Sequence, residues 1–180
     1  MTDGETLLCV DGGTTNTRVW LVRGEEVVAR REAAVGARDT ARDGHNGRWK
    51  AGLRVALDAL LRERPAGVPA PRLVAAAGMI TSPQGLLDLP HVTAPAGTRD
   101  IAAAVREASF PDVSDLPFVF IPGVHTVERP GAAKGVVTAD VMRGEETLCV
   151  GLLERGLLAR GDALLNLGSH WKLVRTDVEA

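Results

Sequence analysis

The first 31 residues alternate short apolar runs with glycine-rich or charged turns. Residues 6–10 form an apolar run that ends at Asp11, residues 17–22 resume with β-forming side chains, and residues 26–31 follow a charged turn. Short β-forming runs separated by a few turn residues are typical of neighbouring antiparallel strands. The pattern therefore predicts three strands and an antiparallel start to a sheet.

A helical spacing of apolar residues follows over residues 49–61, and prolines from Pro65 onward end it. The remaining pattern predicts, in order, a strand over 73–77, a loop over 79–97, a short helix over 100–107, a strand over 118–121, an extended piece at 136–137, a helix over 145–158 that stops at Gly156 or Gly161, and strands over 163–167 and 171–174. This mixture of strands and helices predicts an α/β protein.

Composition narrows the class of protein. A chain of 180 residues is long enough for one well-buried domain, with room for only an incomplete second one. A net charge of −2 gives no general attraction to nucleic acid or to an anionic membrane. Cys9 and Cys149 lie in apolar runs, which favours two buried free thiols over a disulfide. With neither a signal peptide nor an apolar run long enough to span a bilayer, we expect a cytoplasmic protein.

The loop between the first two predicted strands, residues 11–18, has the sequence Asp-Gly-Gly-Thr-Thr-Asn-Thr-Arg. It opens a strand rather than a helix, so it matches neither a P-loop nor a dinucleotide fingerprint. Two glycines let backbone N–H groups approach phosphate oxygens closely, and an aspartate at a strand end can hold a hydrated Mg²⁺. An ordinary Asp-Gly hairpin turn is the alternative, but the hydroxyls and the arginine that follow favour phosphate binding.

A second strand–glycine–strand loop occurs at residues 164–172, where Gly168 is followed by Ser169, His170 and Lys172. The hydroxyl could donate to a phosphate and the lysine could neutralise its charge. Taken alone, a plain hairpin turn explains this loop equally well. Two such loops in one chain are what a kinase needs to hold a triphosphate from both sides of a cleft.

An acidic block at residues 140–147 precedes an apolar helix. It contains two candidate proton acceptors, Asp140 and Glu145, and a cation, Arg143, that suits an anionic substrate. Acidic residues also favour the N-terminal end of a helix for electrostatic reasons alone. The position of these residues alone is explained equally well by a catalytic role and by a helix-capping role.

These motifs together resemble the 2-keto-3-deoxygalactonate kinases. The resemblance covers nearly the whole chain and rests on the first glycine loop, residues 76–80, 89–92 and 121–123, the acidic block, and the second glycine loop. Met-Arg-Gly-Glu-Glu-Thr at 142–147 is the most specific piece. The resemblance implies an actin/hexokinase-like (ribonuclease H-like) N-terminal domain with a mixed sheet, followed by the start of a second, similar domain. It also implies transfer of the γ-phosphate of ATP, with Mg²⁺, to the C6 hydroxyl of the sugar acid.

The resemblance also suggests roles for single residues. The residues expected to bind ATP phosphates are Asp11, Gly12, Gly13, Thr14, Thr15, Arg18, Gly168, Ser169, His170 and Lys172, with Asp11 also organising the metal. The residues expected to bind the sugar acid are Asn16, Met79, Ile80, Thr81, Ser82 and Arg143. The catalytic set is Glu145, Asp140 and Arg143. In related kinases the catalytic carboxylate lies about two turns before a small residue at a helix crossing. Gly151 is the corresponding small residue here, so we favour Glu145 as the base. Ser169 and Trp171 stand where the family's pattern has Thr and Ser.

The resemblance places a kinase domain at residues 1–147, and a crossover helix with the first strands of an incomplete second domain at 148–180. The adenosine site of the wider superfamily lies beyond this length, so we expect a fragment or a shortened relative. The open sheet edge near Ala180 is an association liability, which makes a homodimer one expected assembly. Two other functions compete: a non-catalytic sugar- or nucleotide-binding module, and a phosphatase of the same superfamily. A pure binding module would have no need of Arg143 beside Glu145.

Overall fold

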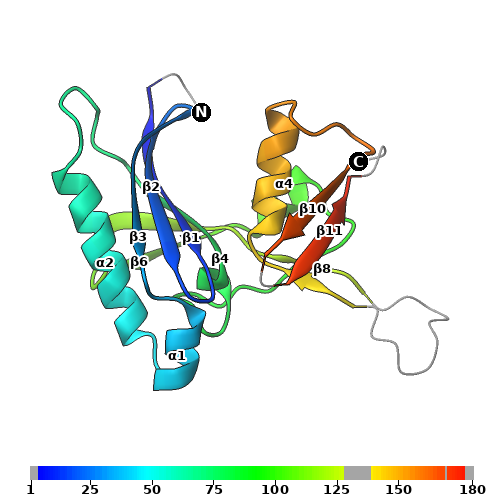
Figure 1. Ribbon diagram of the computed structural model, residues 1–180, viewed down its shortest axis with the longest axis horizontal. Coiled ribbons are helices and arrows are strands. Elements are labelled where there is room, and N and C mark those ends of the chain that lie inside the picture. The colour runs from blue at the N-terminus through cyan, green and yellow to red at the C-terminus, as the bar shows by residue number, and fades with distance from the viewer. Residues whose placement is uncertain (1–3, 128–138, 169, 177–180) are drawn as a thin grey trace. The chain divides into compact units, whose positions relative to one another are not determined.

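The computed structural model describes residues 4–127, 139–168 and 170–176, in two compact units (Figure 1). The first unit comprises Met1–Leu89 and Val105–Ile121, and the second comprises Pro90–Ala104 and Pro122–Ala180. Among the described residues, no helix is long and apolar enough to cross a membrane. The predicted domain division after residue 147 stays a prediction.

A six-stranded mixed sheet forms the centre of the first unit. Its strands are, in spatial order, β3 (Glu26–Ala33), β2 (Thr17–Arg23), β1 (Thr6–Gly12), β4 (Val74–Gly78), β7 (Ser114–Phe120) and β6 (Arg106–Phe110). The first three strands along the chain pair antiparallel, β4 and β7 continue parallel to β1, and β6 closes the sheet antiparallel to β7. The predicted antiparallel start and the predicted mixed α/β architecture are confirmed.

Helix α2 (Gly47–Arg62) packs on this sheet against β2, β3 and β7. Its buried face holds Trp49, Leu53, Leu57 and Leu60, the residues whose helical spacing predicted it. In β1, every second residue is buried, which places Leu8 and Val10 in the same core. Burial of these large apolar side chains is the main force that holds helix and sheet together.

The second unit contains small elements. A three-stranded sheet has the order β5 (Val92–Thr93), β8 (Val124–His125) and β9 (Val141–Met142). The helices are α3 (Thr98–Ala104) and α4 (Glu145–Glu154), and the antiparallel hairpin is β10 (Ala163–Leu167) with β11 (Trp171–Arg175). The predicted strand at 163–167 and its predicted partner are both present.

Several predicted boundaries are wrong, each for a local reason. The helix expected over 100–107 ends at Ala104, because Arg106 begins β6 and pairs with Phe120 of β7. The helix expected over 145–158 ends at Glu154. Of its two expected stops, Gly156 is the one observed, with a left-handed φ of 65°. The expected loop over 79–97 includes the 3₁₀ turn η1 (Met79–Thr81) and β5. The extended piece predicted at 136–137 lies outside the described residues.

Candidate functional site

The first glycine loop connects β1 and β2 as a tight hairpin. The N–H of Gly13 donates to the carbonyl of Asn16 at 2.9 Å, which closes the loop. Asp11 and Arg18 are cross-strand partners, and their side chains form an ion pair of 3.2 Å at the solvent-accessible strand ends. Thr14, Thr15 and Asn16 are exposed at the tip. The tip therefore presents hydroxyl groups, with a carboxylate and a guanidinium at its base.

A short helix braces the loop from the side. The N–H groups of Ala37 and Arg38, in α1 (Ala37–Asp43), donate to the carbonyls of Gly13 and Thr14 at 3.2 and 2.9 Å. At Gly36 a Cβ atom would lie 2.5 Å from the carbonyl oxygen of Gly13, so only glycine permits this approach. The backbone of the loop is thus fixed by contacts that leave its threonine side chains exposed.

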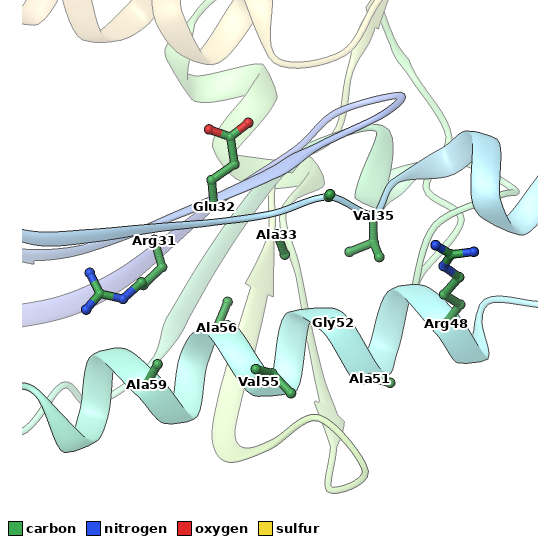
Figure 2. Close-up of a pocket in the computed structure, with 11 residues that line it drawn as sticks. Arg31, Glu32, Ala33, Val35, Arg48, Ala51, Gly52, Val55, Ala56 and Ala59 are labelled. Atoms are coloured by element: carbon green, nitrogen blue, oxygen red, sulfur yellow. The ribbon is translucent and has the colours of Figure 1, made fainter.

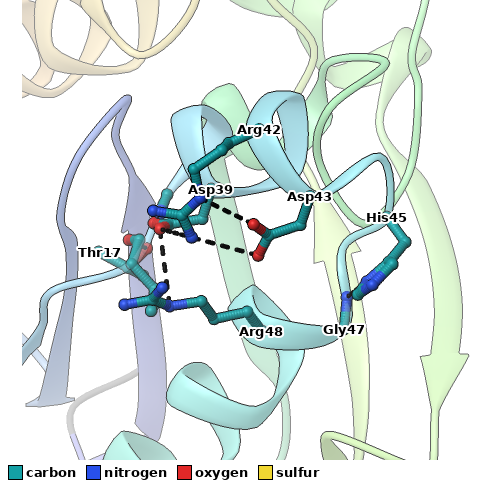
Figure 3. A network of polar contacts seen from close by, with 9 residues as sticks. Thr17, Asp39, Arg42, Asp43, His45, Gly47 and Arg48 are labelled. Carbon is teal, nitrogen blue, oxygen red and sulfur yellow. Dashed lines mark hydrogen bonds and ion pairs between the residues drawn. The ribbon is translucent and has the colours of Figure 1, made fainter.

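A polar network holds α1 in place (Figure 3). The carboxylate of Asp39 accepts from the N–H of Gly36 at 3.0 Å and pairs with Arg42 at 3.2 Å and Arg48 at 3.6 Å. Beneath the loop, the hydroxyl of Thr17 accepts from the indole N–H of Trp49 and donates to the carbonyl of Val35, both at 2.8 Å. This second pair of bonds is fully buried and ties the start of β2 to α2.

The predicted substrate loop lies against the first glycine loop. Gly12 and Gly78 are register partners in β1 and β4, and a Cβ at Gly12 would lie 2.6 Å from that of Ile80. Gly78 has a φ of 86°, and a Cβ there would approach Asp11 Oδ1 to 3.1 Å. The two glycines therefore let the predicted phosphate and sugar-acid segments pack directly together.

Not all side chains of this substrate loop face outward. Ile80 and Thr81 are fully buried, and the hydroxyl of Thr81 donates to the carbonyl of Gly78 at 2.9 Å. Ser82 is buried, and its hydroxyl donates to the carbonyl of Met79 at 2.7 Å. Met79 itself is partly exposed. The contribution of these residues to substrate binding stays a prediction, and their geometry suits a role in shaping the loop.

The acidic block in the second unit is held by its own backbone. Gly144 has a φ of 108°, and its N–H donates to both carboxylate oxygens of Glu146, at 2.8 and 2.9 Å. One residue earlier, the N–H of Arg143 donates to Glu145 Oε2 at 3.0 Å. Two successive glutamates thus bind two successive amides at the start of α4. Glu146 is 2 % exposed, and burial raises its pKa to about 6.

The second glycine loop is linked to this block through its two strands. Asn166 of β10 donates to Glu145 Oε1 at 3.3 Å, and the ammonium group of Lys172 binds Asp140 Oδ1. Asn166 and Lys172 are direct cross-strand partners. The hydrogen bond from Lys172 holds the pKa of the Asp140 carboxyl below its usual range. The structure therefore brings Glu145, Asp140 and Lys172, which the sequence placed in separate motifs, into one cluster.

Arg143 packs beside Gly123. A Cβ at Gly123 would lie 2.6 Å from Arg143 Cγ and 2.9 Å from His91 Cδ2, so the glycine leaves space for both side chains. Gly168 and His170 are exposed at the tip of the second hairpin, and Ser169 lies outside the described residues.

Sequence reasoning missed Asn166 and Glu146. Asn166 carried one available signal: it is a polar residue inside an otherwise apolar strand that runs directly into the glycine loop. Glu146 carried none, because the sequence does not say which of two adjacent glutamates is buried.

A groove of about 490 Å³ lies elsewhere in the first unit, between residues 31–35 and α2 (Figure 2). Small residues such as Ala51 and Ala56 line it, with Arg31 and Arg48 among its polar members. Its described lining shares no residue with the predicted site.

The residues of the first glycine loop suit a cation bound through water molecules better than a cation bound directly by several protein side chains. In the described part of the chain, no three His, Cys, Asp or Glu side chains gather into a metal site. Asp11 nevertheless offers a partly exposed carboxylate, and the exposed threonine hydroxyls beside it are donors suited to phosphate. The donor set is thus consistent with Mg²⁺ that retains its water and is shared with phosphate oxygens.

Comparison with known proteins finds a matching family and similar solved structures. The family model for 2-keto-3-deoxy-galactonokinase matches residues 11–180. A comparison with curated proteins finds no match. A crystal structure from Sinorhizobium meliloti, of a protein named as a 2-dehydro-3-deoxygalactonokinase, is 26% identical with a TM-score of 0.70. The match covers 95% of this chain and 49% of that one, so this chain spans about half the length of that protein.

Proposed function

We propose that this chain, which belongs to the 2-keto-3-deoxy-galactonokinase family, forms part of a kinase that phosphorylates 2-keto-3-deoxygalactonate at its C6 hydroxyl. The observation that carries the proposal is the pair of links from the second glycine loop to the acidic block, Asn166 to Glu145 and Lys172 to Asp140. They join a predicted phosphate site to two predicted proton acceptors. The molecules bound under this proposal are ATP, Mg²⁺ and the sugar acid, in the cytoplasm.

The phosphate end of the site is assigned to the first glycine loop. Asp11 would hold Mg²⁺ through water, while Thr14 and Thr15 would donate to phosphate oxygens. Bound Mg²⁺ neutralises charge on the phosphate oxygens. Arg18 pairs with Asp11 at 3.2 Å and would orient the carboxylate that it binds. The contacts from α1 to Gly13 and Thr14 support this assignment because they fix the backbone before any ligand arrives.

In the second unit, the sugar-acid role is assigned to Arg143. A guanidinium fork suits a carboxylate, which the substrate carries. Glu145 would accept the proton of the C6 hydroxyl as the oxygen forms its bond to the γ-phosphorus and the bond from that phosphorus to the bridging oxygen breaks, releasing ADP. Asp140 is the weaker candidate, since Lys172 already binds it and lowers its pKa. The donors to Glu145, the N–H of Arg143 and the amide of Asn166, are neutral rather than cationic, which supports the choice of Glu145.

A substitution at the first glycine loop tests the proposal. In a full-length chain of the family that carries this segment, Asp11→Asn should reduce turnover by ~10²-fold or more, comparable to loss of an electrostatic contact to the transition state. Asp11 lies at a partly exposed strand end, so the circular dichroism spectrum should not change. Full turnover of the Asp11→Asn protein with ATP and 2-keto-3-deoxygalactonate would remove Asp11 from the site.

A further inference from the structure

The three-stranded sheet of the second unit gathers polar side chains on one of its faces. β8 is its central strand, with β5 parallel on one side and β9 antiparallel on the other. Gly123 precedes β8, and the register of the strands sets His91 on one side of this glycine and Arg143 on the other. Because side chains alternate along a strand, Thr93 and His125 share the same face. We call His91, Thr93, His125 and Arg143 the small-sheet polar face.

Gly123 brings the two side chains that flank it together. A Cβ there would lie 2.6 Å from Arg143 Cγ and 2.9 Å from His91 Cδ2, so both side chains use the space that the glycine leaves open. His91 in turn contacts His125, with ring centroids 6.0 Å apart and an interplanar angle of 61°. Thr93 Oγ1 and His125 Nε2 are hydrogen bonded at 2.9 Å, which orients the second imidazole. The arginine and the two histidines therefore form one contiguous group.

This group is partly shielded and remains accessible at its rim. His91, His125 and Arg143 are half-buried, whereas Thr93 is exposed and Val141, on the same face, is 54% exposed. Partial burial strengthens a hydrogen bond to a charged ligand relative to one in open water. A guanidinium carries five N–H donors and no acceptor, and a neutral imidazole carries one N–H donor. The face therefore suits a ligand with a negative charge and several acceptor oxygens.

We propose that the small-sheet polar face binds the acid end of the sugar acid, its carboxylate and the oxygen on C2; this inference rests on the proposed function. Arg143 pairs with the carboxylate, and His125 donates to the oxygen on C2. His91 is a positioning residue, because its ring packs against the side chain of Arg143 and orients the guanidinium toward the carboxylate. Donors to both groups distinguish the acid from a neutral sugar, so these residues contribute to specificity.

The NMR signals of the histidine rings measure binding of the acid end to the 180-residue chain. The probe is 2-keto-3-deoxygalactonate, and its methyl ester is the matched probe that keeps the sugar oxygens and lacks the charge. The acid should shift the ring signal of His125, assigned by comparison with His125→Phe, at concentrations at which the ester does not. The exposed His45 of the first unit should respond to neither probe. In Arg143→Lys, the same shift should require about 10-fold more acid.

The opposite results would overturn the proposal. These are an unchanged His125 signal in the presence of the acid, or equal shifts with the acid and with its ester.

Steady-state kinetics in a full-length chain of the family that carries this segment test the two roles separately. His125→Phe keeps a ring but has no N–H, so it should raise the KM for the sugar acid by about 10-fold or more and leave the KM for ATP unchanged. His91→Phe keeps a ring against Arg143 and should retain most of the affinity for the sugar acid, whereas His91→Ala should lose it. His45→Phe is the control and should match the parent. An equal rise of both KM values in His91→Ala would overturn its positioning role.

The same measurements distinguish failure of this inference from failure of the proposed function. If Arg143→Lys raises the KM for the sugar acid while His125→Phe and His91→Ala match the parent, the inference is wrong and the proposed function stands. If the acid shifts the His125 signal but the full-length chain does not phosphorylate it, the proposed function is wrong and the acid-binding face stands.

Discussion

Glu146→Gln should remove one specific pH dependence from the stability of the second unit. Glu146 is 2 % exposed, and burial raises its pKa from an ordinary 4.5 to about 6. A pKa difference of one unit between the folded and unfolded states corresponds to about 1.36 kcal/mol, so the raised pKa of Glu146 changes the free energy of unfolding by about 2 kcal/mol across the pH range in which it titrates. The hydrogen bonds from Gly144 and Thr147 oppose the increase but do not cancel it.

The sign of the effect follows from the direction of the pKa change. Between pH 4.5 and 6 the folded protein holds a proton on Glu146 that the unfolded chain has released. This group therefore contributes about 2 kcal/mol of stability below pH 4.5, and the contribution is lost as the pH rises through 6. A glutamine cannot ionise, so its contribution does not change with pH. Stability of the parent should fall relative to Glu146→Gln by about 2 kcal/mol between pH 4 and pH 7.5.

Urea unfolding followed by circular dichroism, repeated across this pH range, measures the difference. The exposed Glu154 at the end of the same helix provides a control, and Glu154→Gln should keep the parent's pH dependence. Curves for the parent and Glu146→Gln that stay parallel from pH 4 to pH 7.5 would show that burial does not govern the ionisation of Glu146.

Two further predictions concern the loops. Gly36→Ala should lower the free energy of unfolding by ~1–3 kcal/mol, since the new Cβ would meet the backbone of Gly13 and Thr14 at 2.5–2.7 Å and force the glycine loop to shift. Thermal unfolding measures the loss. Gly151→Ala, with open space around the added atom, is the matched control. In a full-length chain, Arg143→Lys should raise the KM for the sugar acid far more than that for ATP, because lysine lacks the planar fork; steady-state kinetics would count against the assignment if both KM values rose equally.

Strong, regular patterns in the sequence predicted most of the central sheet and its large helix. Helix α2 buries residues at helical spacing over about three turns, and β1 alternates over seven residues, so local pattern and tertiary packing agree in both. Elements that depend on distant partners were not predicted. β8 and β9 are two residues long; β8 pairs with β5 and with β9, and neither has a local pattern of its own. Helix α1 has seven mainly polar residues and is held by the loop that it braces.

The candidate site shows the same division. The glycine motifs identified the loops themselves, because two backbone segments can approach closely only where at least one of them has glycine. Which loops meet is a property of register: Gly12 meets Gly78 through the parallel pairing of β1 and β4, about 65 residues apart in the chain. The link from Asn166 to Glu145 likewise joins residues that no local pattern connects.

The most direct test of the central claim is the turnover of Glu145→Gln beside Asp140→Asn, in a full-length chain of the family with ATP, Mg²⁺ and 2-keto-3-deoxygalactonate. Glutamine keeps the shape of Glu145 and its hydrogen bond from Arg143 but cannot accept the substrate proton. The account predicts that Glu145→Gln lowers kcat by ~10²-fold or more with little change in substrate binding, and that Asp140→Asn retains most of its activity. Full activity of Glu145→Gln together with an inactive Asp140→Asn would contradict it and move the proton acceptor to Asp140.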